Sequence, residues 1–232
     1  MELLAYGPSG YGDELLGGLL ITLVVAVSSF LGALVLGAGF SLLALSPKKP
    51  LQLVWRVYRS VLMSLPSLLV IFFVYFNAPT LIGALGARSP DISPLAAGIV
   101  ALTLVYAAYV AEVLRGSVLN VPWGQSEAAI SLGIRPWPRW RSIILPQAVR
   151  LALPGLGNIW MIMIKDTALV SLVGLSDIVR QATVAANSTQ RPFLFYFATL
   201  AAFLLIAGLS HAGIRRLEQD EGSGQAAGKG LA

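Results

Sequence analysis

The chain has 232 residues, of which 56% are apolar and only 12% charged, and it contains no cysteine. That charged share is about half the share in soluble domains, and the lack of cysteine excludes disulfides, thiolate metal sites and cysteine catalysis. The formal net charge is +5. Because the basic residues lie in separate short segments and form no continuous surface, the charge does not indicate nucleic-acid binding. The composition favours a membrane protein.

Aspartate, glutamate, lysine and arginine are absent from five long segments, each of which we expect to cross a bilayer as a helix. They are residues 15–45, 61–87, 94–111, 151–164 and 193–214. A helix needs about 20 apolar residues to span the hydrocarbon layer. The fourth segment reaches that length only if it continues through Lys165 and Asp166 to about Leu175. The sequence therefore predicts an all-α membrane protein with five transmembrane helices in one domain, residues 1–218.

The distribution of basic residues predicts the orientation. The first fourteen residues contain no lysine or arginine, so no signal peptide is visible and we expect the first apolar segment to remain as an anchor. With five crossings, twelve of the sixteen basic residues fall on one face and three on the other, while Lys165 lies within the membrane. Since basic loops stay inside, we expect a bacterial inner-membrane protein with its N-terminus outside and its C-terminus in the cytoplasm.

Two prolines interrupt the second predicted crossing. Pro66 and Pro79 each lack a backbone donor and are expected to kink the helix, which a membrane protein tolerates where neighbouring groups satisfy the freed carbonyls. For Pro66 two interpretations stay open. It is either a structural kink or a flexible point that lets the helix line a changing pathway.

Between the third and fourth crossings lies a hydrophilic stretch of about thirty residues, 120–146. Glycine tolerates backbone angles that other residues avoid, so Gly133 is where we expect this stretch to bend. Proline restricts the residue before it to extended geometry, so we expect a short helix to end at Leu145-Pro146. Glu127 is expected early in the first short helix, where a carboxylate stabilises the positive end of the helix dipole.

The same stretch alternates aromatic and basic side chains. Without further information, this mixture is typical of a segment at the membrane surface, with rings at the headgroups and arginines near anionic lipid. Docking of a soluble partner is the other interpretation, and both can hold on opposite faces of the short helices. The residues concerned are Trp123, Trp137, Trp140, Arg135, Arg139 and Arg141.

Several spaced motifs between about Pro94 and Val179 are similar to one known family. They include Tyr109, Glu112, Arg115 and Gly116, then Val121-Pro122-x-Gly124-Gln125-x-Glu127-Ala128-Ala129, then Leu145-Pro146-Gln147-Ala148, Pro154, Gly157-Asn158 and Lys165-x-Thr167-x-Leu169. In this register the chain resembles the permease subunits of binding-protein-dependent ABC importers, in the polar amino-acid family.

The resemblance implies a function and a set of partners. The hydrophilic stretch would be a cytoplasmic coupling loop, helix–Gly–helix in form, that fits a groove in an ATPase. The residues carried over to it are Gly124, Glu127, Ala128, Ala129, Gly133, Ile143, Leu145 and Pro146. The partners would be a second permease subunit, two ATP-binding cassette subunits that hold ATP and Mg, and an extracytoplasmic binding protein. This chain, embedded in the bilayer, would bind no cofactor and catalyse no reaction. Its cargo would be basic or polar amino acids or opines.

Two departures from the family pattern concern the substrate. Met63-Ser64-Leu65-Pro66 stands where relatives often have Arg-Gly-x-Pro, so a positive charge near the pathway is missing. Ile159 stands directly after the Gly-Asn pair, where importers of basic amino acids can carry a glutamate.

Lys165 and Asp166 are the ionisable residues expected at membrane depth, where such groups usually indicate function. Adjacent helical residues point about 100° apart, so these two cannot pair on one face. Either both rise toward the outer headgroups, or Asp166 faces a polar cavity and binds the cationic part of the cargo. The tentative pathway residues are Asp166, Lys165, Asn158, Ile159, Pro66 and Thr167.

The remaining polar features have structural explanations. Glu112 and Arg115 lie three apart and can form an ion pair on one helix face. His211 has no second ligand nearby, so we expect no metal site. Residues 219–232 are charged and then glycine-rich, which predicts a disordered cytoplasmic tail.

A secondary amino-acid transporter or a channel that works without an ATPase is the alternative function. It would need buried relay groups in several helices or an inverted repeat, and neither is visible in the sequence.

Overall fold

The computed structural model describes residues 2–7, 10–84 and 92–229, with side chains described up to Arg216. Over these residues the backbone is helical and turn, without strands. The elements in chain order are η1 (Glu2–Leu4), α1 (Gly12–Leu45), α2 (Lys49–Ser64), α3 (Ser67–Ala84), α4 (Pro94–Leu119), α5 (Trp123–Ser131), α6 (Pro136–Arg139), η2 (Trp140–Ile144), α7 (Leu145–Asp166), η3 (Thr167–Val173), α8 (Ile178–Thr189) and α9 (Pro192–Lys229).

Five helical stretches of the described chain are long and apolar enough to cross a membrane, which confirms the predicted fold class. They are Gly12–Leu45, Ser67–Ala84, Pro94–Leu119, Pro136–Val173 and Pro192–Arg216. The backbone of α9 is helical to Lys229, while the side chains beyond Arg216 are not described. The disorder predicted for residues 219–232 stays a prediction.

The second crossing differs from the prediction. Residues 61–64 belong to α2, and Pro66 lies in a break between α2 and α3 instead of kinking one helix. Leu65 has φ −94° and ψ 138°, the extended geometry that a following proline imposes. In α2, Arg56 and Arg59 accompany the buried Trp55, so this helix is amphipathic and its composition does not suit a lipid-spanning segment. Pro79, as expected, lies inside a helix, α3.

The short helix predicted in the second half of the hydrophilic stretch was also wrongly expected to end at Leu145-Pro146. Leu145 is helical, with φ −60° and ψ −45°, and α6, η2, α7 and η3 follow one another without interruption. The five residues of η2 form a π-helical turn, after which the hydrogen-bond ladder returns to the α register. Pro146 occupies the first turn of α7, where a residue without an N–H is tolerated. The predicted continuation of the fourth crossing past Asp166 is confirmed.

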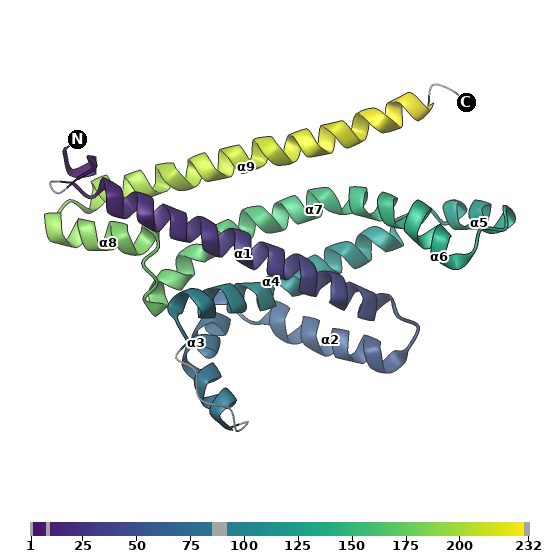
Figure 1. Ribbon diagram of the computed structural model, residues 1–232, viewed down its shortest axis with the longest axis horizontal. Helices are drawn as coiled ribbons and strands as arrows, with labels where there is room; N and C mark the ends of the chain where they lie inside the picture. The colour runs from purple at the N-terminus through teal and green to yellow at the C-terminus, as the bar shows by residue number, and fades with distance from the viewer. Residues whose placement is uncertain (1, 8–9, 85–91, 230–232) are drawn as a thin grey trace.

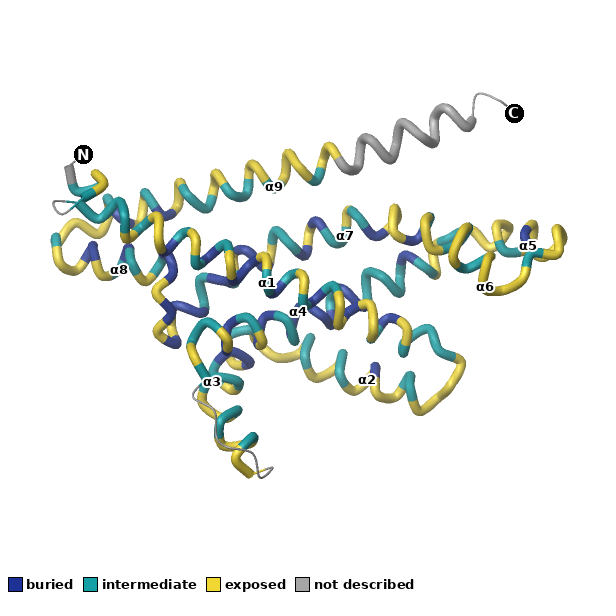
Figure 2. Tube along the Cα trace, in the orientation of Figure 1, coloured by how far each residue is buried: buried dark blue, intermediate teal, exposed yellow. Residues whose placement is uncertain are grey.

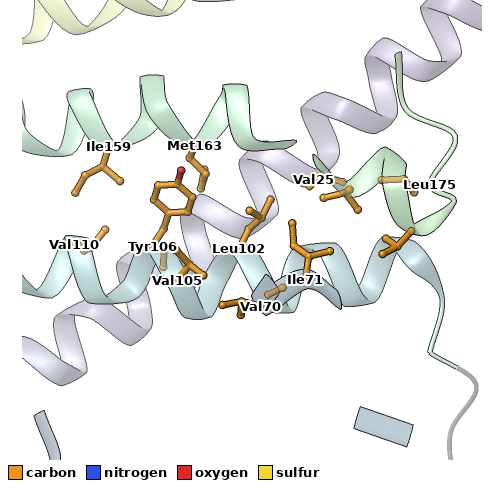
Figure 3. Close-up of a cluster of buried hydrophobic side chains, with 14 residues drawn as sticks. Val25, Val70, Ile71, Leu102, Val105, Tyr106, Val110, Ile159, Met163 and Leu175 are labelled. Atoms are coloured by element: carbon orange, nitrogen blue, oxygen red, sulfur yellow. The ribbon is translucent and has the colours of Figure 1, made fainter. Parts of the chain in front are cut away.

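α4 lies at the centre of the bundle and packs between α1 and α7 (Figure 1). Small residues allow this close approach. A Cβ added to Gly37 of α1 would lie 2.6 Å from Val110 of α4, and one added to Gly98 of α4 would lie 2.5 Å from Val170. The main hydrophobic cluster forms along this contact, with Tyr106 directed toward α7 (Figure 3). Among the described residues, side chains therefore fill the interior of the bundle along α4.

The two ends of the bundle carry different elements. α8 lies beside the beginning of α1, while α5 and α6 project at the opposite end, beyond α4 and α7 (Figure 1). α3 leaves the bundle at an angle. In the most apolar 18-residue stretches of α3 and of α9 only 11% of residues are buried, against 56% in that of α4. Figure 2 shows this contrast. The surfaces of α3 and α9 are thus available to lipid or to another subunit.

Candidate functional site: the elbow and the charged end of α7

The segment from α5 to α6, residues 123–139, forms a bent projection that we call the elbow. At its bend Gly133 adopts φ +69°, a left-handed conformation that glycine accepts without strain. The Gly133 amide donates to the Ile130 carbonyl at 2.9 Å, and the Ile134 amide donates to the Ala129 carbonyl at 3.0 Å. These two bonds close the end of α5, as in a Schellman motif. The expected helix–Gly–helix form is confirmed.

The elbow exposes an apolar surface beyond the end of the bundle. The exposed fractions are 73% for Trp123, 56% for Ile130 and 78% for Leu132, and the carboxylate of Glu127 is exposed beside them. Contiguous apolar residues outside the hydrophobic bundle mark an interaction surface. This arrangement is suited to docking a partner through a mixed apolar and acidic patch.

Glu127 differs from its prediction in one respect. It is the fifth residue of α5, and the first turn of that helix holds no acidic residue. Since the dipole effect falls off within the first turn, Glu127 gains little from it. Its exposed carboxylate is instead free to meet a group on a partner.

The elbow is attached to α7 by side-chain and backbone contacts. The Gln147 side-chain amide donates to the Ile143 carbonyl at 2.8 Å and to Gln125 Oε1 at 3.4 Å, which ties α5 to the start of α7. Ala129 is 2% exposed and anchors the inner side of α5. Gly124 and Ala128 are exposed, Ile143 is half-buried, and Leu145 and Pro146 are exposed on the continuous helix. The elbow is therefore connected to α7 both by these hydrogen bonds and by a continuous helical backbone.

At the other end of α7, Asp166 has a partner that the sequence did not reveal. The Tyr106 hydroxyl, from α4, donates to Asp166 Oδ2 at 2.9 Å. Lys165 points elsewhere, as the helical geometry predicted, and lines a mostly apolar groove of about 450 Å³ between α7 and α9. Asp166 therefore faces α4, whereas Lys165 faces the groove beside α9.

The other tentative pathway residues do not form one polar site with Asp166. Ile159 is 5% exposed and belongs to the main hydrophobic cluster (Figure 3). Thr167 is buried, and its hydroxyl donates to the Ile164 carbonyl at 2.6 Å. Asn158 is exposed on α7, and Pro66 is exposed at the break before α3. Asp166 and Tyr106 therefore form the polar centre of this region.

Glu112 lies between two arginines. Arg115 Nη1 is 3.2 Å from Glu112 Oε1, within the same helix, and Arg59 Nη1 of α2 is 3.3 Å from Glu112 Oε2. The contact with Arg59 was not anticipated, because α2 was not recognised as a separate helix. The carboxylate bridges α2 and α4 near the elbow end of the bundle.

Replacing Glu112 with glutamine is expected to lower the thermal unfolding midpoint by a small amount. All three side chains are at least a third exposed, and solvent-screened pairs contribute about 0.2–1 kcal/mol each. The measurement is a double-mutant cycle of Glu112→Gln with Arg59→Gln, with Arg115→Gln as the intrahelical comparison. A coupling energy of zero between Glu112 and Arg59 would contradict the bridging role.

At the opposite end of the bundle, Asp177 caps α8. Its Oδ1 accepts from the Arg180 amide at 2.9 Å, and its side chain is almost completely buried. Among the described residues no donor reaches Oδ2. Burial, the largest influence, raises the pKa of Asp177 to about 6. The junction is tight, because a Cβ on Gly18 of α1 would lie 2.8 Å from the backbone of Asp177.

Asp177→Asn is expected to remove a pH dependence of stability. The pKa of Asp177 is about 6 in the folded chain and has its usual value of 3.8 in the unfolded chain, so the folded chain binds the proton more tightly. The stability of the fold therefore decreases as pH rises from about 4 to about 6 and is constant above. At neutral pH the charged side chain costs up to about 3 kcal/mol, whereas asparagine is uncharged and still caps the helix. Thermal unfolding of the variant should occur at a higher temperature at pH 7 and at the wild-type temperature near pH 4. Parallel pH profiles would contradict this account.

No cluster of potential metal ligands occurs within the part of the chain that the structure describes. His211, exposed on α9, has no such neighbours.

The comparisons with known proteins agree with this geometry. A family described as "binding-protein-dependent transport system inner membrane component" matches residues 33–219. The chain is 41% identical to the nopaline transport system permease protein NocQ of Agrobacterium fabrum, with 94% of this chain and 95% of that one covered. It is 34% identical to the histidine/lysine/arginine/ornithine transport system permease protein HisQ of Escherichia coli, with coverage of 90% and 94%.

Solved structures show the same arrangement of helices. A crystal structure of an amino acid ABC transporter with histidines has a TM-score of 0.81 at 30% identity, and covers 90% of this chain and 95% of that one. An inward-facing MetNI methionine ABC transporter has a TM-score of 0.71 at 18% identity, with coverage of 89% and 95%, and supports the fold alone. The family match spans most of the chain, and the curated relatives match over nearly their full length. The chain therefore belongs to the binding-protein-dependent transport system inner membrane components, as a permease subunit of an importer whose ATPase is a separate subunit.

Proposed function

We propose that this permease carries amino acids or amino-acid derivatives, either basic or polar amino acids or opines. The single observation that carries the proposal is the similarity, over about nine-tenths of the chain, to permeases whose names specify nopaline and basic amino acids. The fold it shares with a transporter solved with histidines supports the same class.

We further propose that the elbow faces the cytoplasm and the N-terminus faces outside. The turn after α1, which carries Lys48 and Lys49, lies at the same end of the bundle as α6, which ends at Arg139 and is followed by Arg141 in η2 (Figure 1). Basic residues are retained on the inner side. Arg180, in α8, belongs to the opposite end, where basic residues are few.

The proposed assembly contains two permease subunits, two ATPase subunits and an extracytoplasmic binding protein. The need for a second permease follows from the core, since the side chains around α4 fill the interior of this bundle. A solute pathway then runs along the outside of the bundle, between two copies or between this chain and a close relative. α3, which leaves the bundle and buries little of its surface, is suited to that contact.

In this proposal the elbow couples ATP binding to alternating access. ATP and Mg are held by the ATPase subunits, which close together and move the docked elbow. The uninterrupted helix from α6 to α7 then shifts the end of α7 that carries Asp166. Work comes from the preference of ATP for one of the two conformations, because a ligand shifts an equilibrium only by its differential affinity.

Asp166 is the proposed contact for the cationic part of the cargo. Its carboxylate lies at the outer part of a crossing helix. It accepts one hydrogen bond from the Tyr106 hydroxyl and can accept further hydrogen bonds from a cargo. Ile159, by contrast, offers no second charge on this side of the pathway. A cargo with two positive groups would then depend on a carboxylate from the second permease.

The test is uptake by the complete transporter reconstituted in vesicles with its binding protein. We expect uptake of a labelled basic amino acid or opine only when ATP and the ATPase subunits are present. Uptake driven by an ion gradient without the ATPase would instead favour the secondary transporter. Uptake restricted to solutes other than amino acids and their derivatives would refute the substrate class while leaving the coupling in place.

A further inference from the structure

An apolar groove opens where the elbow meets the membrane helices. Its walls come from the last turns of α1, the end of α4 and the stretch from α6 to the start of α7, and its volume is about 370 Å³. Leu42 and Leu45 form one wall, Val118 another, and Trp137 and Trp140 the third. A second recess of about 500 Å³ shares Trp140 and continues past the end of α1 to Ser46. We call the two together the elbow groove.

The elbow groove lies at the level of a membrane interface. α1 and α4 both end there, at Leu45 and Leu119, and tryptophan is enriched at this depth because its ring is amphipathic. Trp137 is 67% exposed, so one side of the groove is open to the surroundings. Covering the apolar walls of such a groove is favourable, so the elbow groove is suited to an apolar occupant such as an acyl chain.

Basic residues adjoin the lining of the elbow groove in two segments of the chain. Ser46 lines the recess and its hydroxyl accepts from the backbone amide of Lys48 at 3.3 Å, with Lys49 next in sequence. On the other side, Arg139 and Arg141 flank the lining residue Trp140. Glu112 forms its ion pairs with other arginines, Arg59 and Arg115. Basic residues of two segments about ninety residues apart thus adjoin the lining of one groove, and the residues that line it include no carboxylate.

We propose that the elbow groove binds an anionic phospholipid of the leaflet that faces the elbow. An acyl chain occupies the apolar walls, and the phosphate accepts hydrogen bonds from the lysines of the α1–α2 turn and the arginines beside Trp140. Charge complementarity favours a lipid over other occupants, because an apolar helix of another subunit would offer no anionic group to the four basic residues that adjoin the groove lining. Arginine is well matched to phosphate, which it binds in a bidentate manner. The bound lipid would contact α1, α4 and the base of the elbow at once.

The first experiment identifies the occupant directly. A photoreactive benzoylphenylalanine replaces Ala38, an exposed residue that lines the groove, in the complete transporter reconstituted in phosphatidylethanolamine nanodiscs containing phosphatidylglycerol. We expect cross-linking to phosphatidylglycerol in preference to phosphatidylethanolamine. The same group at Gly39, the adjacent residue outside the groove, is the matched control and should show no preference. Cross-linking of the Ala38 position to a second permease or to an ATPase would overturn the proposal.

The second experiment tests the basic residues that adjoin the groove lining. Each basic side chain near an anionic lipid surface contributes about a fivefold change in affinity, so Arg139→Gln with Arg141→Gln should reduce phosphatidylglycerol retention at least severalfold in native mass spectrometry of the purified complex. Arg180→Gln with Arg191→Gln, at the other end of the bundle, is the matched control and should retain it. Equal loss in both pairs, or no loss in either, would refute the site. Because lipid retention is measured without transport, this result is independent of the proposed substrate.

Discussion

Gly133→Pro is expected to abolish ATP-driven uptake while the chain remains inserted and folded in the membrane. Gly133 has φ +69° and its amide donates to the Ile130 carbonyl. Proline fixes φ near −65° and has no N–H, so it cannot adopt the bend and loses the bond that closes α5. The exposed patch on α5 would then point away from its partner. The measurement is uptake in reconstituted vesicles together with the ATPase rate of the same preparation.

A graded series at Gly133 separates bend geometry from general damage. A Cβ at this position meets no atom within 4 Å, so substitutions act only through the backbone. Asparagine is among the few residues that tolerate left-handed φ, and Gly133→Asn should retain most uptake, while Gly133→Ala costs about 1–2 kcal/mol in this conformation and should be intermediate. Uptake unaffected by Gly133→Pro, or lost equally in all three variants, would contradict the role of the bend.

Glu127→Ala tests the contribution of the exposed carboxylate to the same coupling surface. The carboxylate is exposed and accepts no hydrogen bond given by the described structure, so its removal should leave folding unchanged. If it meets a basic group of the ATPase, uptake should fall while ATP hydrolysis continues.

Asp166→Asn is expected to reduce uptake of a basic amino acid by about tenfold to a hundredfold, because a hydrogen bond to a charged group contributes about 1.5–3 kcal/mol. Asparagine keeps the size of the side chain and can still accept from the Tyr106 hydroxyl, so only the charge is lost. Uptake of a neutral polar amino acid should change much less. The measurement is competition between the two cargoes in the same vesicles.

Tyr106→Phe is the matched control for Asp166. It removes the hydroxyl that lies 2.9 Å from Oδ2 and keeps the carboxylate, so the loss should be smaller and similar for both cargoes. If Asp166→Asn reduces basic and neutral cargo equally, Asp166 is a structural residue and the proposed cation contact is wrong.

The amino-acid sequence was sufficient to predict the five crossings and the bend at Gly133. These depend on local properties, namely long runs without charge and one residue type that accepts a left-handed backbone. A kink within one crossing was predicted at Pro66, where the chain instead breaks between α2 and α3. The amphipathic character of α2 becomes clear only once Trp55 is seen to be buried. The continuous helix through Pro146 was missed because Leu145, as the residue before a proline, locally favours extended geometry. Tertiary packing overrides this preference, and the chain passes through a π-helical turn there.

Contacts between distant segments were beyond the reach of sequence reasoning. The bond from Tyr106 to Asp166 joins residues sixty apart, and the contact from Arg59 to Glu112 joins residues fifty-three apart. Neither pair has a spacing pattern that a helical repeat could reveal. The buried Asp177 was equally invisible, since its desolvation comes from α1 packing against the start of α8.

Docking of the elbow to an ATPase on the cytoplasmic side can be tested by the accessibility of a single cysteine. The chain has no cysteine of its own, so Ser131→Cys, exposed at the end of α5, and Ser188→Cys, exposed on α8, each give one reactive thiol. We predict that a membrane-impermeant maleimide labels the Ser131→Cys protein only in inside-out vesicles, that added ATPase subunits block this labelling, and that Ser188→Cys labels only from the opposite side. Labelling of Ser131→Cys from outside, or labelling that the ATPase does not reduce, would contradict the account.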